Sequence, residues 1–152
     1  MADPRRLQCL EAMQTAFQEM APPAWDFAFD QVQIGPLPKV QERKRHSVGI
    51  VAARETKIVL FPVTDALAEV NLELRMQWNT TDTDLPGIVA ERFLAQVSKM
   101  VANNTNLGGL AIDWKELGSE LQLVSWMDRA IEAVIFTELR YRHATLDPYA
   151  PA

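Results

Sequence analysis

The chain has 152 residues, 48% of them apolar, and a net charge of −5 at pH 7, as expected of one ordinary globular domain. The negative charge argues against general electrostatic binding to nucleic acid or anionic lipid, and no apolar run approaches the roughly 20 residues that span a bilayer. A single cysteine, Cys9, excludes an internal disulfide, and no secretory signal is apparent, so we expect a reducing compartment and no membrane.

The first predicted element is a helix that starts at Asp3-Pro4 and stops at Pro22-Pro23. Its apolar stripe consists of Leu7, Leu10, Met13, Phe17 and Met20, and we expect Cys9 to be a small buried side chain on it. The alternation of Trp25, Phe27 and Phe29 with polar or small residues then predicts a strand that ends at Gly35-Pro36.

Three strands are expected in the next segment, after a polar loop at residues 39–46. Two short ones cover residues 48–52 and 57–61, joined across Arg54-Glu55. The clearest strand covers residues 70–78, where apolar Val70, Leu72, Leu74, Met76 and Trp78 alternate with polar residues. One face of this strand should therefore meet the core and the other water or a polar interface.

A second helix should follow, capped by Asp84 with Pro86 in its first turn. Its stripe is Leu85, Ile88, Val89, Phe93, Val97, Met100 and Val101, and it should end between Asn103-Asn104 and Gly108-Gly109.

The last third of the chain is read as strands. Leu110, Ile112 and Trp114 alternate into one, and a turn near Leu117-Gly118-Ser119 should lead into the next. Residues 119–130 also fit a helix, but strands are favoured through to Leu139 because β-branched and aromatic residues cluster there. Residues 131–141 are apolar on both faces, which predicts a strand inside a sheet, covered by helices or by another subunit. The order of elements predicts an α+β fold, a mostly antiparallel or mixed sheet with two main helices on one face, in a single domain over residues 1–152.

No motif for catalysis, a cofactor or a metal is found. His46 and His143 each stand beside an arginine and lack a second ligand at metal-binding spacing, so we interpret both as surface histidines. Gly108-Gly109 lacks the pattern of a phosphate loop, and capping explains Asp82 and Asp84 without a paired-carboxylate site. We expect no enzyme.

Protein contacts are the remaining role for polar side chains. The candidates are the basic loop residues Arg43, Lys44 and Arg45, for which a solvated loop is the competing interpretation. The others are Glu73 and Arg75 on the polar strand face, the segment Tyr141, Arg142 and His143, and the residues Asp147 and Tyr149 of a short extended tail at 144–152.

The layout resembles that of the tail terminator (tail completion) proteins of long-tailed bacteriophages. The similarity lies in the capped first helix before a proline-bounded strand, in the run NNTNLGGLAID at residues 103–113, and in the ending LRYRH followed by DPY. The basic loop at residues 39–46 departs from what is recognised of that family.

The resemblance implies a structural virion protein of the tail or neck, assembled in the host cytoplasm. Its subunits would form a homo-hexameric ring on the head-proximal end of the tail tube, end tube polymerisation and join the tail to the head connector or stopper. Genomic DNA would pass through the ring without sequence-specific binding. The alternatives are another neck component, either a stopper or a head-completion protein, and a small ligand-binding α+β domain with tryptophan walls at Trp25, Trp78, Trp114 or Trp126.

Overall fold

The computed structural model describes residues 4–38, 46–77, 86–125 and 130–151. They form two helices and one five-stranded sheet: α1 Arg5–Gln18, β1 Gln31–Ile34, β2 His46–Leu60, β3 Val63–Gln77, α2 Pro86–Asn103, the 3-10 turn η1 Leu107–Gly109, β4 Asp113–Ser125 and β5 Ala130–Ala144. The order across the sheet is β1-β2-β3-β5-β4, with β1 parallel to β2 and all other pairs antiparallel. The predicted α+β class with a mixed sheet is confirmed.

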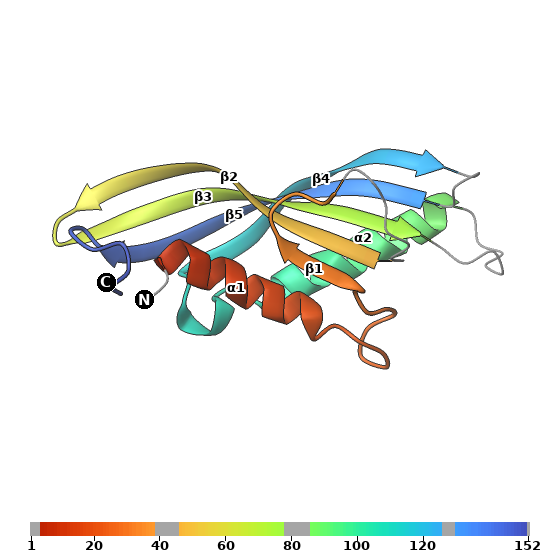
Figure 1. Ribbon diagram of the computed structural model, residues 1–152, viewed down its shortest axis with the longest axis horizontal. Helices are drawn as coiled ribbons and strands as arrows, with labels where there is room; N and C mark the ends of the chain where they lie inside the picture. The colour runs from red at the N-terminus through yellow and green to blue at the C-terminus, as the bar shows by residue number, and fades with distance from the viewer. Residues whose placement is uncertain (1–3, 39–45, 78–85, 126–129, 152) are drawn as a thin grey trace.

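Both helices lie on the same face of the sheet, and the core fills the space between the two layers (Figure 1). α1 contributes Cys9, Leu10, Met13 and Phe17, and α2 contributes Phe93, Val97, Met100 and Val101, as their stripes predict. In β3 and β5 the residues that face the helices pair across the ladder, for example Leu72 with Ile135 and Val70 with Thr137. We call this side the covered face and the opposite side the open face.

The final strand lies inside the sheet, as predicted, between β3 and β4. The described residues of the ambiguous segment, 119–125 and 130–139, are strand, which confirms the preferred interpretation; residues 126–129 lie outside the described chain. The helices cover only one face of β5. Val134 lies on the open face and is 8% exposed. No described helix lies over the open face of the sheet (Figure 1).

A buried hydrogen-bonded group joins three strands at the centre of the sheet. The indole Nε1–H of Trp114 donates to Thr137 Oγ1 at 2.9 Å, and the Thr137 hydroxyl donates to the Val70 carbonyl oxygen at 2.7 Å. Trp114 is fully buried and Thr137 is 1% exposed. Trp114 is therefore a core residue whose polar atom is satisfied within the chain.

The two short strands predicted at residues 48–52 and 57–61 are one strand, β2, and the prediction of a break is wrong. Its register against β3 shifts between Ala52 and Arg54, which is a β-bulge. One extra residue reverses the alternation of side chains, so Val48 and Ile50 lie on the covered face before the bulge, and after it Val59 lies on that side of the sheet. A reversed alternation in the sequence looks like the end of a strand.

A β-bulge also explains why the prediction of a turn near Leu117-Gly118-Ser119 is wrong. β4 continues through this point, with register shifts between Glu116 and Gly118 and again between Leu121 and Leu123. The strand predicted from Trp25 is wrong up to Asp30, because β1 comprises only Gln31–Ile34. Phe27 and Phe29 instead pack against Phe93 at ring-centre distances of 5.1 and 6.1 Å.

The chain after β5 folds back in turns rather than continuing as an extended tail. The Thr145 amide donates to the Pro62 carbonyl at 2.8 Å, and the Arg5 amide donates to the Pro148 carbonyl at 3.0 Å. Pro4 is the N-cap of α1 and supplies no side-chain acceptor, while Asp3, the predicted cap, lies outside the described residues. Residues 145–151, which we call the C-terminal turn, thus supply an acceptor that the start of α1 needs.

Candidate assembly interface

Exposed apolar side chains gather where β2 turns into β3. Ile58, Val59, Leu60 and Phe61 are 60, 62, 58 and 70% exposed, and Leu146 of the C-terminal turn is 86% exposed. The C-terminal turn lies beside the hairpin, to which Thr145 is hydrogen-bonded (Figure 1). Because side chains alternate along β2, Ile58 and Leu60 lie on the open face and Val59 on the other side of the strand. We call these five residues together the hairpin end. Clustered apolar exposure of this kind is typical of sites that contact another protein.

The backbone edge of β2 is unpaired toward the hairpin end, because β2 is much longer than its outer neighbour. β1 pairs only with residues 47–50, and no described strand pairs with the outer side of residues 51–60. The backbone N–H and C=O groups of that outer side are therefore open over most of the strand. An unpaired edge of this length that ends in the apolar residues Ile58, Val59 and Leu60 is an aggregation hazard unless something covers it.

The opposite edge of the sheet, β4, is also open but has a different character. Among the described strands it pairs only with β5, and it carries two bulges. Ile112, just before the strand, is 42% exposed, and Leu117 and Leu121 within it are 55 and 44% exposed. We call residues 112–121 the β4 edge. Its charged residues are Asp113, Lys115, Glu116 and Glu120, an excess of two negative charges.

The region around the hairpin end has the opposite charge. We define this hairpin region as the first turn of α1 together with residues 54–65 and 140–151. It holds six cations and three carboxylates: Arg5, Arg6, Arg54, Lys57, Arg140 and Arg142, against Glu55, Asp65 and Asp147. On a chain with a net charge of −5, the hairpin region defined in this way is locally basic.

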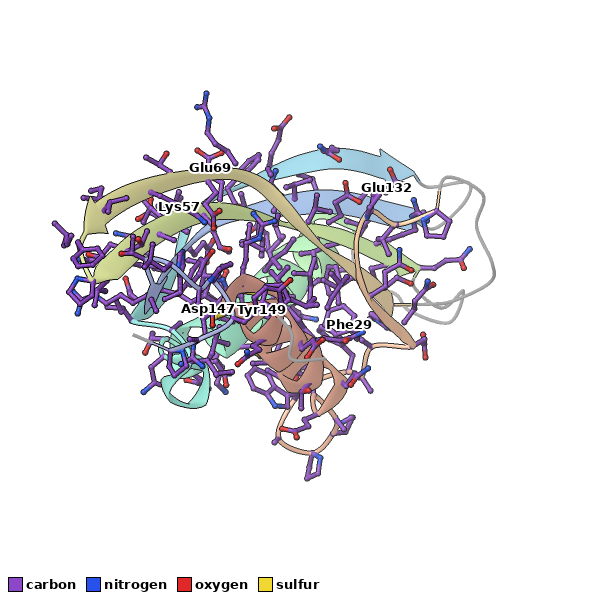
Figure 2. The ribbon with its side chains drawn as sticks, turned by 60° about the vertical axis from the view of Figure 1, so that its left-hand side comes forward. Phe29, Lys57, Glu69, Glu132, Asp147 and Tyr149 are labelled. Carbon is purple, nitrogen blue, oxygen red and sulfur yellow. The ribbon has the colours of Figure 1, made fainter. Side chains whose placement is uncertain are left out.

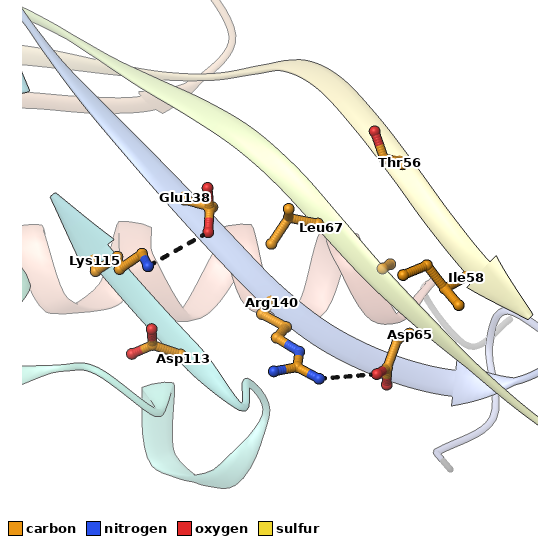
Figure 3. Close-up of a pocket in the computed structure, with 9 residues that line it drawn as sticks. Thr56, Ile58, Asp65, Leu67, Asp113, Lys115, Glu138 and Arg140 are labelled. Atoms are coloured by element: carbon orange, nitrogen blue, oxygen red, sulfur yellow. Dashed lines mark hydrogen bonds and ion pairs between the residues drawn. The ribbon is translucent and has the colours of Figure 1, made fainter. Parts of the chain in front are cut away.

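A hollow of about 320 Å³ lies on the open face near the hairpin end (Figure 3). Leu67 and Ile58 supply its apolar side chains, while Arg140 bonds Asp65 at 3.0 Å and Lys115 pairs with Glu138 at 3.7 Å. Hydrogen bonds from Arg142 and Arg140 lower the pKa of Asp65. Four of the five charged residues that line the hollow are thus paired with one another, and Asp113 is the fifth.

The side chains of the polar candidates Glu73 and Arg75 form hydrogen bonds with the backbone of their own chain. Glu73 Oε2 accepts from the Leu37 amide at 3.0 Å, and Arg75 donates to the Pro38 carbonyl at 2.9 Å and to Glu132 at 3.2 Å. The segment after β1 therefore lies across part of the open face. Both side chains are half-buried, with their polar atoms engaged inside the subunit.

The C-terminal candidates divide between core and surface. Tyr141 is 3% and His143 4% exposed. The pKa of Tyr141 is raised mainly by burial and, to a smaller extent, by its hydrogen bond to Glu55. Their side chains face the helices, so they are not a surface of the subunit. Arg142 lies on the open face, bound to Asp65, and Asp147 and Tyr149 lie beside the first turn of α1 (Figure 2).

The expectation of two surface histidines is wrong. His46 is 8% exposed and stacks on Phe27 at a ring-centre distance of 4.7 Å, and His143 Nδ1 lies 2.7 Å from the Ala144 carbonyl oxygen. Arg142 is next to His143 in the sequence but lies on the opposite face of β5, because side chains alternate along a strand. Cys9 is buried as predicted, and burial raises the pKa of its thiol to about 11.

Several sequence candidates lie outside the described residues: Arg43, Lys44 and Arg45 of the basic loop, the capping residues Asp82 and Asp84, and Trp78 and Trp126. Within the described ranges no group of three or more His, Cys, Asp or Glu side chains is arranged to hold a metal ion. The helices that are described include none of the length and apolarity that a membrane crossing requires.

The residues of the hairpin end were missed by the sequence reasoning. The run Ile58-Val59-Leu60-Phe61 was interpreted only as a strand. A strand that is apolar on both sides normally lies in the middle of a sheet, and β5 does. The same composition on a strand that turns out to be an edge is the signal of a contact surface, but the sequence alone does not show which strand has only one neighbour.

Comparisons with known proteins give a remote structural likeness. No family profile and no curated protein matches the chain. One similar solved structure is the sheath/tube terminator of an extracellular contractile injection system (PVC) in its extended state. The TM-score is 0.34 with 11% sequence identity, over 97% of this chain and 59% of the other. The chain thus spans little more than half the length of that protein, and a likeness this remote assigns no function.

Proposed function

We propose that this protein is a structural tail-terminator subunit that assembles into a ring on the end of a phage tail tube. The observation that carries the proposal is the pair of open, unlike edges on opposite sides of one sheet, one of them apolar and locally basic. A subunit that offers two different contact surfaces associates head to tail, and such contacts form a closed ring when the rotation between copies closes.

The paired charges of the open-face hollow favour an assembly role over catalysis or ligand binding. Four of the charged residues that line the hollow are bound to one another, as Arg140 with Asp65 and Lys115 with Glu138. None of its lining residues is a tryptophan, contrary to the pocket envisaged for a ligand-binding domain. Trp114 is in the core, and Trp25 packs beneath the ammonium group of Lys99 at 5.1 Å from the ring centre. Both described tryptophans therefore have structural positions.

In this role the ring covers the last ring of tube protein and presents a different outer surface to the head connector or stopper. Tube growth stops because the added ring does not reproduce the tube's own binding surface. The six-fold symmetry and both partners follow from the resemblance to the terminator family. A chain of net charge −5 suits a channel through which DNA passes without being held, because like charges repel.

The proposal is tested by mass and by tail length. Native mass spectrometry of the purified chain, alone and with tube protein, should show a six-subunit species, and particles assembled without the chain should carry overlong tubes. A protein that stays monomeric both alone and in the presence of tube protein would refute ring assembly. Tubes of normal length that lack heads would instead indicate another neck component, a stopper or a head-completion protein.

A further inference from the structure

We propose that the hairpin end of one copy of this chain packs against the β4 edge of the next copy. This inference rests on the proposed function, because it names the surfaces by which the ring would close. The hairpin end consists of Ile58, Val59, Leu60, Phe61 and Leu146, and the β4 edge comprises residues 112–121. The hairpin end of each copy thus binds the β4 edge of a second copy.

Charge decides between this arrangement and a contact of like surfaces. Two hairpin regions facing each other would bring together two sets of six cations and three carboxylates, which repel. Two β4 edges would bring together an excess of negative charge. Only the unlike pairing, in which Lys57 and Arg54 approach Glu116 and Glu120, joins surfaces of opposite sign.

Both surfaces of the proposed contact, the hairpin end and the β4 edge, expose apolar side chains. The hairpin end offers five large side chains that are 58 to 86% exposed, and the β4 edge offers Ile112, Leu117 and Leu121 at 42 to 55%. Both sets are surrounded by charged residues. An apolar centre with a charged rim is the usual anatomy of a specific protein contact.

The geometry of β4 points to side-chain packing rather than to one continuous ladder between copies. Its two bulges, at Leu117 and Gln122, interrupt the regular spacing of backbone groups that an added strand would need. The bulge at Leu117 leaves that side chain 55% exposed, the highest value among the apolar residues of the β4 edge. Leu117 is therefore the residue we expect to be covered first by the neighbouring hairpin.

Two double variants and one control test the pairing. V59S/L60S removes apolar contact from the hairpin end, L117S/L121S removes it from the β4 edge, and I88S changes a comparable exposed side chain, 43% exposed, on α2. Burying a large apolar side chain contributes enough that losing two should weaken the contact roughly 100-fold. Circular dichroism and thermal unfolding should show all three folded, because the altered side chains are exposed.

Native mass spectrometry should then show rings for the wild type and I88S, monomers for each double variant alone, and a one-to-one heterodimer when the two double variants are mixed. The mixture retains one intact hairpin end and one intact β4 edge, so it can make one contact and no ring. If V59S/L60S is monomeric while L117S/L121S still dimerises, like surfaces pair and the inference is wrong. If both double variants still form rings, the ring uses other surfaces and the proposed function survives. A wild type that stays monomeric both alone and with tube protein would overturn both proposals.

Discussion

Replacing Thr137 by valine should destabilise the fold although the two side chains have nearly the same shape. The change leaves no cavity, but it removes the acceptor of the Trp114 Nε1–H group, which lies 2.9 Å from Thr137 Oγ1 in a fully buried position. An unpaired buried donor costs about 1–3 kcal/mol. For a chain of this size the unfolding temperature should fall by roughly 2–4 °C per kcal/mol.

The control for this prediction is Thr137→Ser, which keeps the hydroxyl and deletes one methyl group. Its cost should be about 1 kcal/mol, the usual loss for one buried methyl. Urea unfolding should therefore rank the midpoints as wild type, T137S and T137V, in descending order, with unchanged slopes. In the W114F background the valine should cost less, because the donor is gone. The reasoning fails if T137V is as stable as T137S or more so.

Truncation after Ala144 should lower the free energy of unfolding by about 1–2 kcal/mol, because the Arg5 amide loses the Pro148 carbonyl as its acceptor; urea unfolding measures this, and an unchanged midpoint would contradict it. Asp65→Asn should lower the unfolding temperature at pH 7. Because its arginine partners lower the pKa of Asp65 below 3.8, the stabilisation is complete above that value and lost as the pH falls through the lowered pKa, so wild type and variant should converge in acid. Leu74→Asp, a charge placed at a position 2% exposed, should abolish soluble expression, and recovery of folded protein would mean that the strand faces the other way.

The sequence predicted best those elements whose alternation is uninterrupted. The strand at residues 70–77 and the final strand have the predicted type and facing, because each has one covered face over its whole length. The described residues of the helix stripes also face the sheet, except Ile88, which was predicted to lie on the stripe of α2 but is 43% exposed. The fold class follows from the order of these elements. Cys9 was also predicted correctly, since its place on an apolar stripe leaves one direction for its side chain.

The features that could not be predicted from the sequence are those that depend on residues distant in the chain. Bulges at Ala52/Arg54 and Glu116/Gly118 reverse the alternation and were interpreted as a junction between strands and as a turn. Phe27 and Phe29 alternate because they pack on Phe93, not because they pair in a sheet. The hairpin end was missed for the same reason, since whether a strand is central or peripheral is decided by pairing across the whole fold.

Gly49 controls how much of the open face is available. A Cβ atom at this position would lie 2.7 Å from the Gly35 carbonyl oxygen and 3.1 Å from the Leu37 amide nitrogen. Both contacts are to backbone, so any larger residue must push the segment after β1 away from the sheet, together with its bonds to Glu73 and Arg75. The absence of one side chain thus divides the sheet into a half closed by the chain itself and a half, toward the hairpin, that stays open to a neighbour. The protein thus limits the open area of this face from within, through a buried residue covered by its own backbone.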